Sequence, residues 1–239
     1  MVKKLALILL LFPLASMAAD EVEPAPGGWQ GEGELGFTST SGNSDTENLN
    51  ARLTVSRESD QWKHIASLDS IKNKSEDETT ADSLVLKGRS EYSLGEKSYA
   101  FGQLRLEDDE FSGYEFQRTL TFGAGSRFIE NDKQLLDASI GLGYRSLKDR
   151  ETGDTEEDSI VTADAKYEYK ISETATFNQT ILIESGDENR YTESDTSLKT
   201  KIDGNLAAKI SYLVKRNSEV PSGTDKSDKI TTISLVYAF

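Results

Sequence analysis

The sequence predicts an all-β fold, a twelve-stranded antiparallel transmembrane β-barrel with short periplasmic turns and long acidic extracellular loops. Apolar and polar side chains alternate in runs that repeat from Trp29 onward. The repeat is roughly 18 residues per strand with its connection, which is the period of a β-hairpin rather than a solenoid. The final run carries Ile233, Leu235, Tyr237 and Phe239 at every second position, so these side chains share one face of a strand.

Twelve runs have this alternation of apolar and polar side chains, and each is long enough to cross a bilayer as a tilted strand. They are Trp29 to Thr40, Glu47 to Ser56, Trp62 to Lys72, Asp82 to Leu94, Ser98 to Leu106, Tyr114 to Arg127, Gln134 to Arg145, Ile160 to Tyr169, Thr174 to Glu184, Thr192 to Ile202, Leu206 to Lys215 and Lys229 to Phe239.

In the first six runs, apolar side chains mark the face that we expect to point outward. The third run is ambiguous, because Leu68 and Ile71 lie on opposite faces. The positions expected to face outward are Leu35, Phe37, Leu49, Ala51, Leu53, Val55, Leu84, Leu86, Tyr92, Leu94, Leu104, Leu106, Leu120, Phe122 and Ala124.

The later runs show the alternation over longer stretches. From Gln134 to Arg145, large apolar side chains alternate with Asp137, Ser139, Gly141 and Gly143. The outward positions in the seventh to ninth runs are Leu136, Ala138, Ile140, Leu142, Tyr144, Val161, Ala163, Ala165, Tyr167, Tyr169, Phe177, Ile181 and Ile183.

The connections alternate in length, as they do in barrels with periplasmic turns and extracellular loops. The short ones are Arg57 to Gln61, Gly95 to Lys97, Phe128 to Lys133, Lys170 to Glu173 and Asp203 to Asn205. The long ones are Ser41 to Thr46, Asn73 to Ala81, Glu107 to Gly113, Ser146 to Ser159, Ser185 to Tyr191 and Asn217 to Asp228. An even number of strands then places both ends of the barrel on the periplasmic side.

The N-terminal residues have the pattern of a secretory signal peptide. Lys3 and Lys4 precede an apolar stretch from Leu5 to Leu14, and small residues suited to signal peptidase end at Ala18 and Ala19. The apolar stretch is shorter than the roughly 20 residues of a spanning helix. We therefore expect a signal peptide at residues 1–19, a short linker at 20–28 and the barrel at 29–239.

Composition limits the possible partners and cofactors. Without Lys3 and Lys4 the chain has 25 basic and 42 acidic residues, a charge of −17, which argues against nucleic acid as a partner. The absence of Cys excludes disulfides, thiolate metal sites and lipoprotein attachment. A mean hydropathy of −0.54 is compatible with a barrel, because only every second residue faces lipid. A soluble β-sandwich would also alternate, but its polar faces would not need so many charges.

The chain resembles the outer membrane β-barrel family of uncharacterised function that includes the protein called salt-induced outer membrane protein. The resemblance lies in the segments 33–37, 41–46, 118–125, 212–218 and 235–239. It implies a barrel in the outer membrane of a Gram-negative bacterium and an envelope role linked to osmotic or salt stress. It implies no chemistry, no cofactor and no oligomeric state.

The last strand also resembles the C-terminal assembly signal of such barrels, which ends in Phe behind alternating apolar residues. Ile233, Leu235, Tyr237 and Phe239 would carry this signal. The resemblance implies insertion by the barrel assembly machinery, and contact with outer membrane lipid and lipopolysaccharide.

Strand parity also predicts which charges face the interior. Eleven basic and eight acidic residues take the inward parity, an excess of positive charge in an acidic chain. The acids are Glu32, Glu34, Asp69, Glu91, Asp137, Asp164, Glu168 and Glu184. The basic residues are Arg52, Lys87, Arg89, Arg105, Arg127, Arg145, Lys166, Lys199, Lys201, Lys209 and Lys215. Two interpretations remain open: a narrow, porin-like small-solute diffusion channel with mild anion preference, and a plug of paired charges.

Two further classes of function receive little support. His64 is the one histidine, and no nucleophile can be paired with it from sequence, so we expect no enzyme. Acidic segments at 75–78, 107–110 and 154–158 attract cations, but none has the carboxylate spacing of an EF-hand loop. We therefore predict no metal site.

Overall fold

The computed structural model describes residues 28–40, 46–75, 78–110, 114–150, 152–187, 189–220 and 226–239. The predicted signal peptide, and the predicted linker up to residue 27, lie outside these residues. The described residues contain no helix that is long and apolar enough to cross a bilayer.

The described residues form twelve β-strands, each paired antiparallel with its sequence neighbours, and β12 closes the sheet on β1. The strands are β1 (Trp29–Thr40), β2 (Thr46–Ser59), β3 (Trp62–Ser75), β4 (Glu78–Ser93), β5 (Ser98–Asp109), β6 (Tyr114–Glu130), β7 (Gln134–Asp149), β8 (Thr155–Lys170), β9 (Ala175–Ser185), β10 (Arg190–Asp203), β11 (Leu206–Asn217) and β12 (Ser227–Ala238). The predicted twelve-stranded antiparallel barrel is confirmed.

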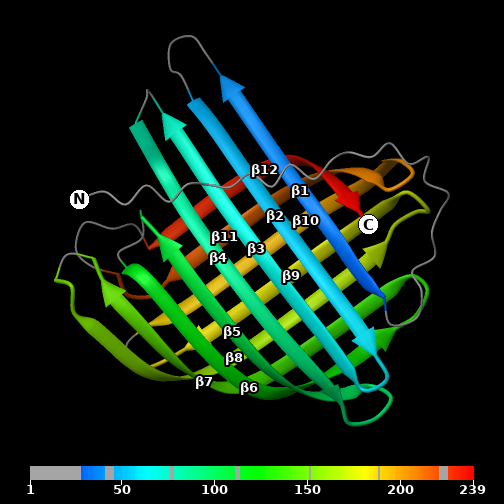
Figure 1. Ribbon diagram of the computed structural model, residues 1–239, viewed down its shortest axis with the longest axis horizontal. Helices are drawn as coiled ribbons and strands as arrows, with labels where there is room; N and C mark the ends of the chain where they lie inside the picture. The colour runs from blue at the N-terminus through cyan, green and yellow to red at the C-terminus, as the bar shows by residue number, and fades with distance from the viewer. Residues whose placement is uncertain are drawn as a thin grey trace.

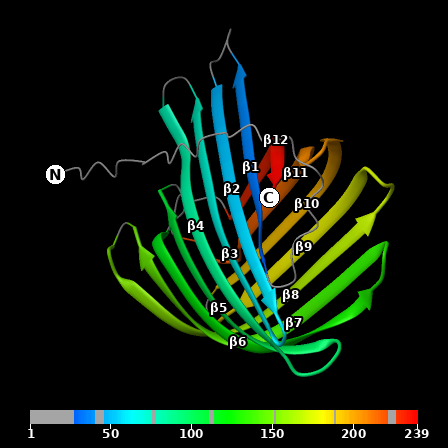
Figure 2. The same ribbon diagram turned by 45° about the vertical axis from the view of Figure 1, so that its right-hand side comes forward.

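The strands are tilted, as barrel closure requires. Figures 1 and 2 show β1 to β4 on one wall and β7 to β9 on the opposite wall, with the two sets crossing at a steep angle. The short connections, such as 60–61, 131–133 and 204–205, lie together at what we call the short-turn end. The opposite end is called the long-loop end.

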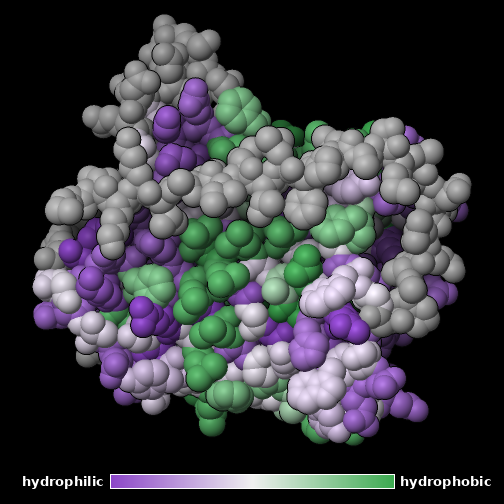
Figure 3. Space-filling model, in the orientation of Figure 1, coloured by the Kyte–Doolittle hydropathy of each residue, from purple (hydrophilic) through white to green (hydrophobic). Residues whose placement is uncertain are grey.

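The outer surface of the barrel is apolar. Leu35, Phe122 and Leu142 are each more than half exposed, because their side chains point away from the interior. Figure 3 shows apolar side chains gathered in the middle of one face, with hydrophilic groups on both sides of them. In the ambiguous third run, Leu68 is on this exposed face, and Ile71 lines a small internal cavity.

Several strands are longer than predicted at the long-loop end. β5 continues to Asp109, β7 continues to Asp149, and β8 already begins at Thr155. The predicted loops at 107–113 and 146–159 are therefore shorter than expected, and part of each acidic segment lies in a strand. Cross-strand hydrogen bonds keep these charged residues in β structure, although apolar side chains no longer alternate with polar ones here.

The seam between β1 and β12 is the shortest pairing of the barrel. It has five residue pairs, from Glu32 with Ala238 to Gly36 with Ser234, whereas β1 and β2 pair over the whole length of β1. Gly31 and Phe239 add two mutual backbone hydrogen bonds of 2.7 and 2.9 Å. The Phe239 ring covers Gly31 and occupies the space that a Cβ there would take.

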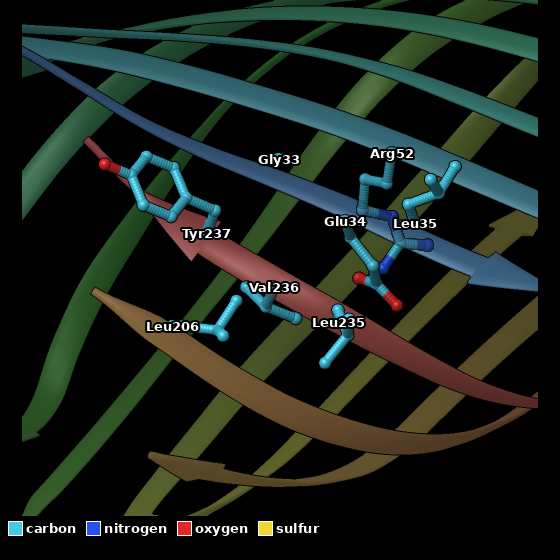
Figure 4. A pocket seen from close by; sticks show the side chains of 8 residues that line it. All are labelled: Gly33, Glu34, Leu35, Arg52, Leu206, Leu235, Val236 and Tyr237. Atoms are coloured by element: carbon cyan, nitrogen blue, oxygen red, sulfur yellow. The ribbon is translucent and has the colours of Figure 1, made fainter. Parts of the chain in front are cut away.

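A pocket of about 340 Å³ opens at this seam. Leu35 and Leu235 line it, and Figure 4 shows Tyr237 at one end of it, with the Glu34 and Arg52 side chains towards the other. The four side chains of the predicted assembly signal, Ile233, Leu235, Tyr237 and Phe239, are all exposed on the outer face of β12.

Inward-facing glycines on β6 let two aromatic rings of β5 fill the neighbouring interior. The Tyr99 ring occupies the space that a Cβ on Gly125 would take. A Cβ on Gly123 would collide with the Ile140 carbonyl oxygen, and would lie 2.7 Å from both the Gly141 Cα and the Phe101 ring. Two of these three neighbours are backbone atoms, which cannot rotate away.

Replacing Gly123 therefore tests this close approach. Gly123→Val should destabilise the folded barrel by about 1–3 kcal/mol or more, since overpacking must separate β6 from β7. The urea midpoint of protein refolded into lipid vesicles, followed by tryptophan fluorescence, measures the effect. Gly88→Val is the control, because nothing lies within 4 Å of a Cβ at Gly88. Equal midpoints for the two variants would contradict the argument.

Candidate functional site in the barrel interior

The interior is the candidate functional site, because charged side chains from most strands meet there. Most of the nine basic residues singled out as interior charges form ion pairs with carboxylates that the structure describes. The pairs are Arg52 with Asp69 and Asp195, Lys87 with Glu193, Arg89 with Glu91 and Asp164, Arg105 with Glu107 and Glu193, Arg127 with Asp137, Arg145 with Asp158, and Lys199 with Glu32. Lys166 and Lys201 are exposed.

Some of these ion pairs join strands that are not neighbours in the sheet. Arg52 on β2 lies 3.2 Å from Asp195 on β10, and β1, β12 and β11 separate those strands. Lys87 on β4 lies 3.2 Å from Glu193, also on β10. Such pairs can form only through the interior, so the opposite walls are within side-chain reach of one another.

Two more ion pairs lie behind the β1–β12 seam. The Lys209 Nζ on β11 is 2.8 Å from the Glu34 Oε2 on β1, and the Ser234 hydroxyl on β12 donates to the same carboxylate at 2.6 Å. The Lys199 Nζ on β10 is 2.7 Å from the Glu32 Oε2. These contacts tie β11 to β1 across β12, and β10 to β1 across β11 and β12.

The most buried group of charges is centred on Arg105. The Arg105 Nη2 lies 2.6 Å from the Glu107 Oε2 and 3.2 Å from the Glu193 Oε2, and its guanidinium lies 4.7 Å from the centre of the Tyr191 ring. The Lys215 Nζ also lies 2.8 Å from Glu107. Arg105, Glu107 and Tyr191 are each 2% exposed. Buried charges without partners are very costly, so each member of this group depends on the others.

A second buried group lies nearer the long-loop end. Arg145 on β7 is 1% exposed, and its Nη2 donates to Asp158 at 3.1 Å and to the Asn189 carbonyl at 2.9 Å. The Asn189 side chain in turn donates to Asn217 at 2.9 Å. This group links β7, β8, the connection before β10, and β11.

The side of the interior next to β6 and β7 is filled by aromatic and hydroxyl groups. The Arg89 guanidinium lies 3.8 Å from the centre of the Phe101 ring and donates to Ser139 at 3.2 Å. Tyr99 donates to Asp137. Thr121 is 1% exposed, although it faces the middle of the barrel. Side chains therefore fill the interior on this side of the barrel.

The predicted excess of positive charge inside the barrel is wrong. Four acids that pair with interior cations, Glu107, Asp158, Glu193 and Asp195, were absent from the predicted inward set. Adding them to the eight predicted acids removes the excess over the eleven basic residues.

The missed acids had a signal in the sequence. Glu193 and Asp195 share the parity of Lys199 on the same strand, and Glu107 follows Arg105 by two residues. They were overlooked because β10 has few apolar residues to mark its faces, and because Glu107 and Asp158 were assigned to loops.

The single histidine has a hydroxyl partner on the next strand. The His64 Nδ1 lies 2.9 Å from the Ser90 Oγ, and the ring stacks on Trp62 with 5.7 Å between the ring centres. Serine catalysis also needs a group that orients the histidine, and donors for an oxyanion. Among the residues that the structure describes, the contacts of His64 supply neither, and the pair has the geometry of an ordinary cross-strand contact. The described residues contain no cluster of His, Asp and Glu suited to a metal ion.

Comparison with family models matches residues 33–239 to the family described as "Protein of unknown function, DUF481". The chain belongs to this family. The curated relative "Uncharacterized protein YdiY" of Escherichia coli (strain K12) is 27% identical over 220 residues, covering 92% of this chain and 86% of the relative. The name linked to salt induction does not occur in either match.

Solved structures of outer membrane barrels share the fold of this DUF481 member. An outer membrane channel from Pseudomonas putida F1 has a TM-score of 0.55 at 11% identity, and covers 92% of this chain and all of its own. The NanC porin has a TM-score of 0.54 at 15% identity, and covers 87% of this chain and 98% of its own. At such identities the likeness shows the architecture only.

Removing Arg105 tests how strongly the barrel depends on its buried charges. Arg105→Met should lower the stability by about 3–5 kcal/mol, because it leaves Glu107 and Glu193 buried with one fewer cation. Lys148→Met is the matched control, since the Lys148–Glu115 pair is half exposed and such pairs contribute roughly 0–1 kcal/mol. Urea unfolding in lipid vesicles compares the two variants. A loss for Arg105→Met no larger than that of the control would refute the dependence.

Proposed function

We propose that this DUF481 protein is an integral outer membrane barrel whose interior is closed by paired charges, and that it serves as an envelope component under osmotic or salt stress. The observation that carries the proposal is the set of ion pairs that cross the interior, from Arg52 to Asp195, Lys87 to Glu193 and Lys215 to Glu107. A side-chain network that joins opposite walls leaves little room for a permanently open pore.

The outer surface supports the membrane part of the proposal. Leu142, Phe122 and Ile233 are more than 60% exposed, which would promote aggregation in water but suits contact with lipid acyl chains. Trp29, Trp62 and Tyr237 lie exposed towards the short-turn end, where interfacial aromatic residues are expected. The barrel assembly machinery would insert the chain, with β12 as the strand that it recognises.

The burial of the ion pairs supports the link to salt stress. Screening acts strongly on exposed charges beyond about 8 Å at physiological ionic strength, and much less on buried pairs. The Arg105–Glu107 and Lys209–Glu34 pairs are buried from solvent, so high external salt reaches them poorly. A barrel closed in this way adds no ion leak when the salt concentration outside the cell rises.

Planar-bilayer recording tests the closed state. Refolded protein should insert without discrete conductance steps at low and at high salt, because the crossing ion pairs remain in place. A general porin added afterwards to the same bilayer controls for insertion and recording. Discrete openings of the native protein would contradict the proposal. A reversal potential near the anion value, moved by neutralising Arg89 and Arg105, would then favour the narrow small-solute channel with mild anion preference.

A deletion strain tests the stress role and the absence of enzymatic activity together. Loss of the protein should lower survival after an abrupt rise in external salt, and the native gene and His64→Ala should restore survival equally, because His64 has no catalytic arrangement around it. Colony counts after the salt shift measure the effect. Unchanged survival of the deletion strain would remove the stress role. Restoration by the native gene alone would show that His64 has an active function.

A further inference from the structure

Three cations lie close together on the outer wall of the barrel, near the long-loop end. Arg190 begins β10, Arg216 lies near the end of β11, and Lys229 lies near the start of β12, and all three are exposed. The neighbouring Tyr191 and Lys215 are buried inside the barrel. Since side chains alternate along a strand, the three cations point outward, away from the interior network.

Strand register brings Arg216 and Lys229 next to each other. Arg216 lies directly opposite Ser227 on β12, and Lys229 lies opposite Val214 on β11. The two cations are therefore diagonal neighbours across the β11–β12 ladder. Diagonal positions on one face of a sheet are about 7–8 Å apart, within reach of long side chains.

The same relation holds between Arg216 and Arg190. Arg216 lies opposite Thr192 on β10, and the Ser218 amide donates to the Arg190 carbonyl at 2.9 Å, which places Arg190 opposite Ser218. The three cations thus form one diagonal row across β10, β11 and β12. We call this row the cation triad.

The cation triad lacks carboxylate partners among the residues that the structure describes. The outward positions between its members, Thr192, Val214 and Ser227, are uncharged. Three other exposed cations of the long-loop end are paired with carboxylates. These are Lys72 with Asp82 at 2.6 Å, Lys148 with Glu115 at 2.6 Å and Lys226 with Glu219 at 3.8 Å. In a chain with a net charge of −15, three adjacent unpaired cations call for an anionic partner.

Apolar side chains continue the same outer face towards the middle of the barrel. Tyr212 and Ile210 follow on β11, and Ile233 follows on β12, all exposed. The surface is thus cationic at the long-loop end and apolar beneath it. This pattern matches a ligand that has an anionic headgroup above acyl chains.

We propose that the cation triad binds the phosphate groups of lipid A, the phosphorylated glycolipid anchor of lipopolysaccharide in the outer leaflet. The inference rests on the proposed outer membrane location. The guanidinium groups of Arg190 and Arg216 can each give paired hydrogen bonds to a phosphate, and Lys229 adds a third charge. The acyl chains lie along Tyr212 and Ile233.

Native mass spectrometry of the refolded, detergent-solubilised full chain measures this binding. Bisphosphorylated lipid A is titrated against the native protein and against Arg190→Gln/Arg216→Gln/Lys229→Gln. The triple variant should bind about tenfold more weakly or worse, because charge-assisted contacts to phosphate are lost. Lys72→Gln/Lys148→Gln/Lys226→Gln is the matched control, which removes the same number of charges from paired cations and should keep native affinity.

The results that would contradict the proposal can be told apart. Equal weakening in both triple variants would overturn the site, because attraction would then depend on net charge alone. If inorganic phosphate displaced lipid A at an equal concentration, lipid A would be rejected as the ligand. The heat-dependent mobility of each variant in gel electrophoresis reports whether its barrel is folded. Channel openings of the native protein in bilayers would reject the closed interior but would leave lipid A binding unchanged, so the two proposals fail separately.

Discussion

The structure depends on one electrostatic constraint: a charge placed inside the barrel must have a partner there. Arg105 shows the constraint most clearly, because it is nearly inaccessible to solvent and contacts two carboxylates and an aromatic ring. Glu107 is held in turn by Lys215 from β11. The Arg105–Glu193 and Lys215–Glu107 pairs each fix the distance between two different parts of the wall. The ion pairs thus determine how far the barrel opens, as well as neutralising its interior.

The same constraint compensates for the weakest joint of the sheet. β1 and β12 share five residue pairs, so backbone hydrogen bonds contribute less there than between any fully paired strands. Lys209 and Lys199 reach past β12 to Glu34 and Glu32 on β1. Side-chain charges therefore bind β1 to β10 and β11 directly. On the closed interior that we propose, the same network would both complete the barrel and close its interior.

The sequence was sufficient to predict the strands but not to predict their contacts across the interior. Alternation at period two predicts twelve strands, and places residues such as Leu35 and Leu142 on the outer face. It could not decide which face of the third run points outward, since Leu68 and Ile71 are both apolar and lie on opposite faces. Nor could it find Asp195 as the partner of Arg52, because that contact depends on barrel curvature and on strand register summed over several hairpins. Extending the alternation of faces from Lys199 back along β10 would have placed Glu193 and Asp195 inward. This would have corrected the apparent excess of positive charge.

The central claim is that the middle of the interior is closed to water and ions. The chain has no Cys, so a single introduced thiol reports local access without background. Thr121→Cys probes a buried inward position, and Lys166→Cys probes an inward position that remains exposed. In protein reconstituted into lipid vesicles, a charged thiol reagent should modify Thr121→Cys at least about a hundredfold more slowly than Lys166→Cys, because a buried thiol is both shielded and harder to ionise. Equal rates at the two positions would contradict the account.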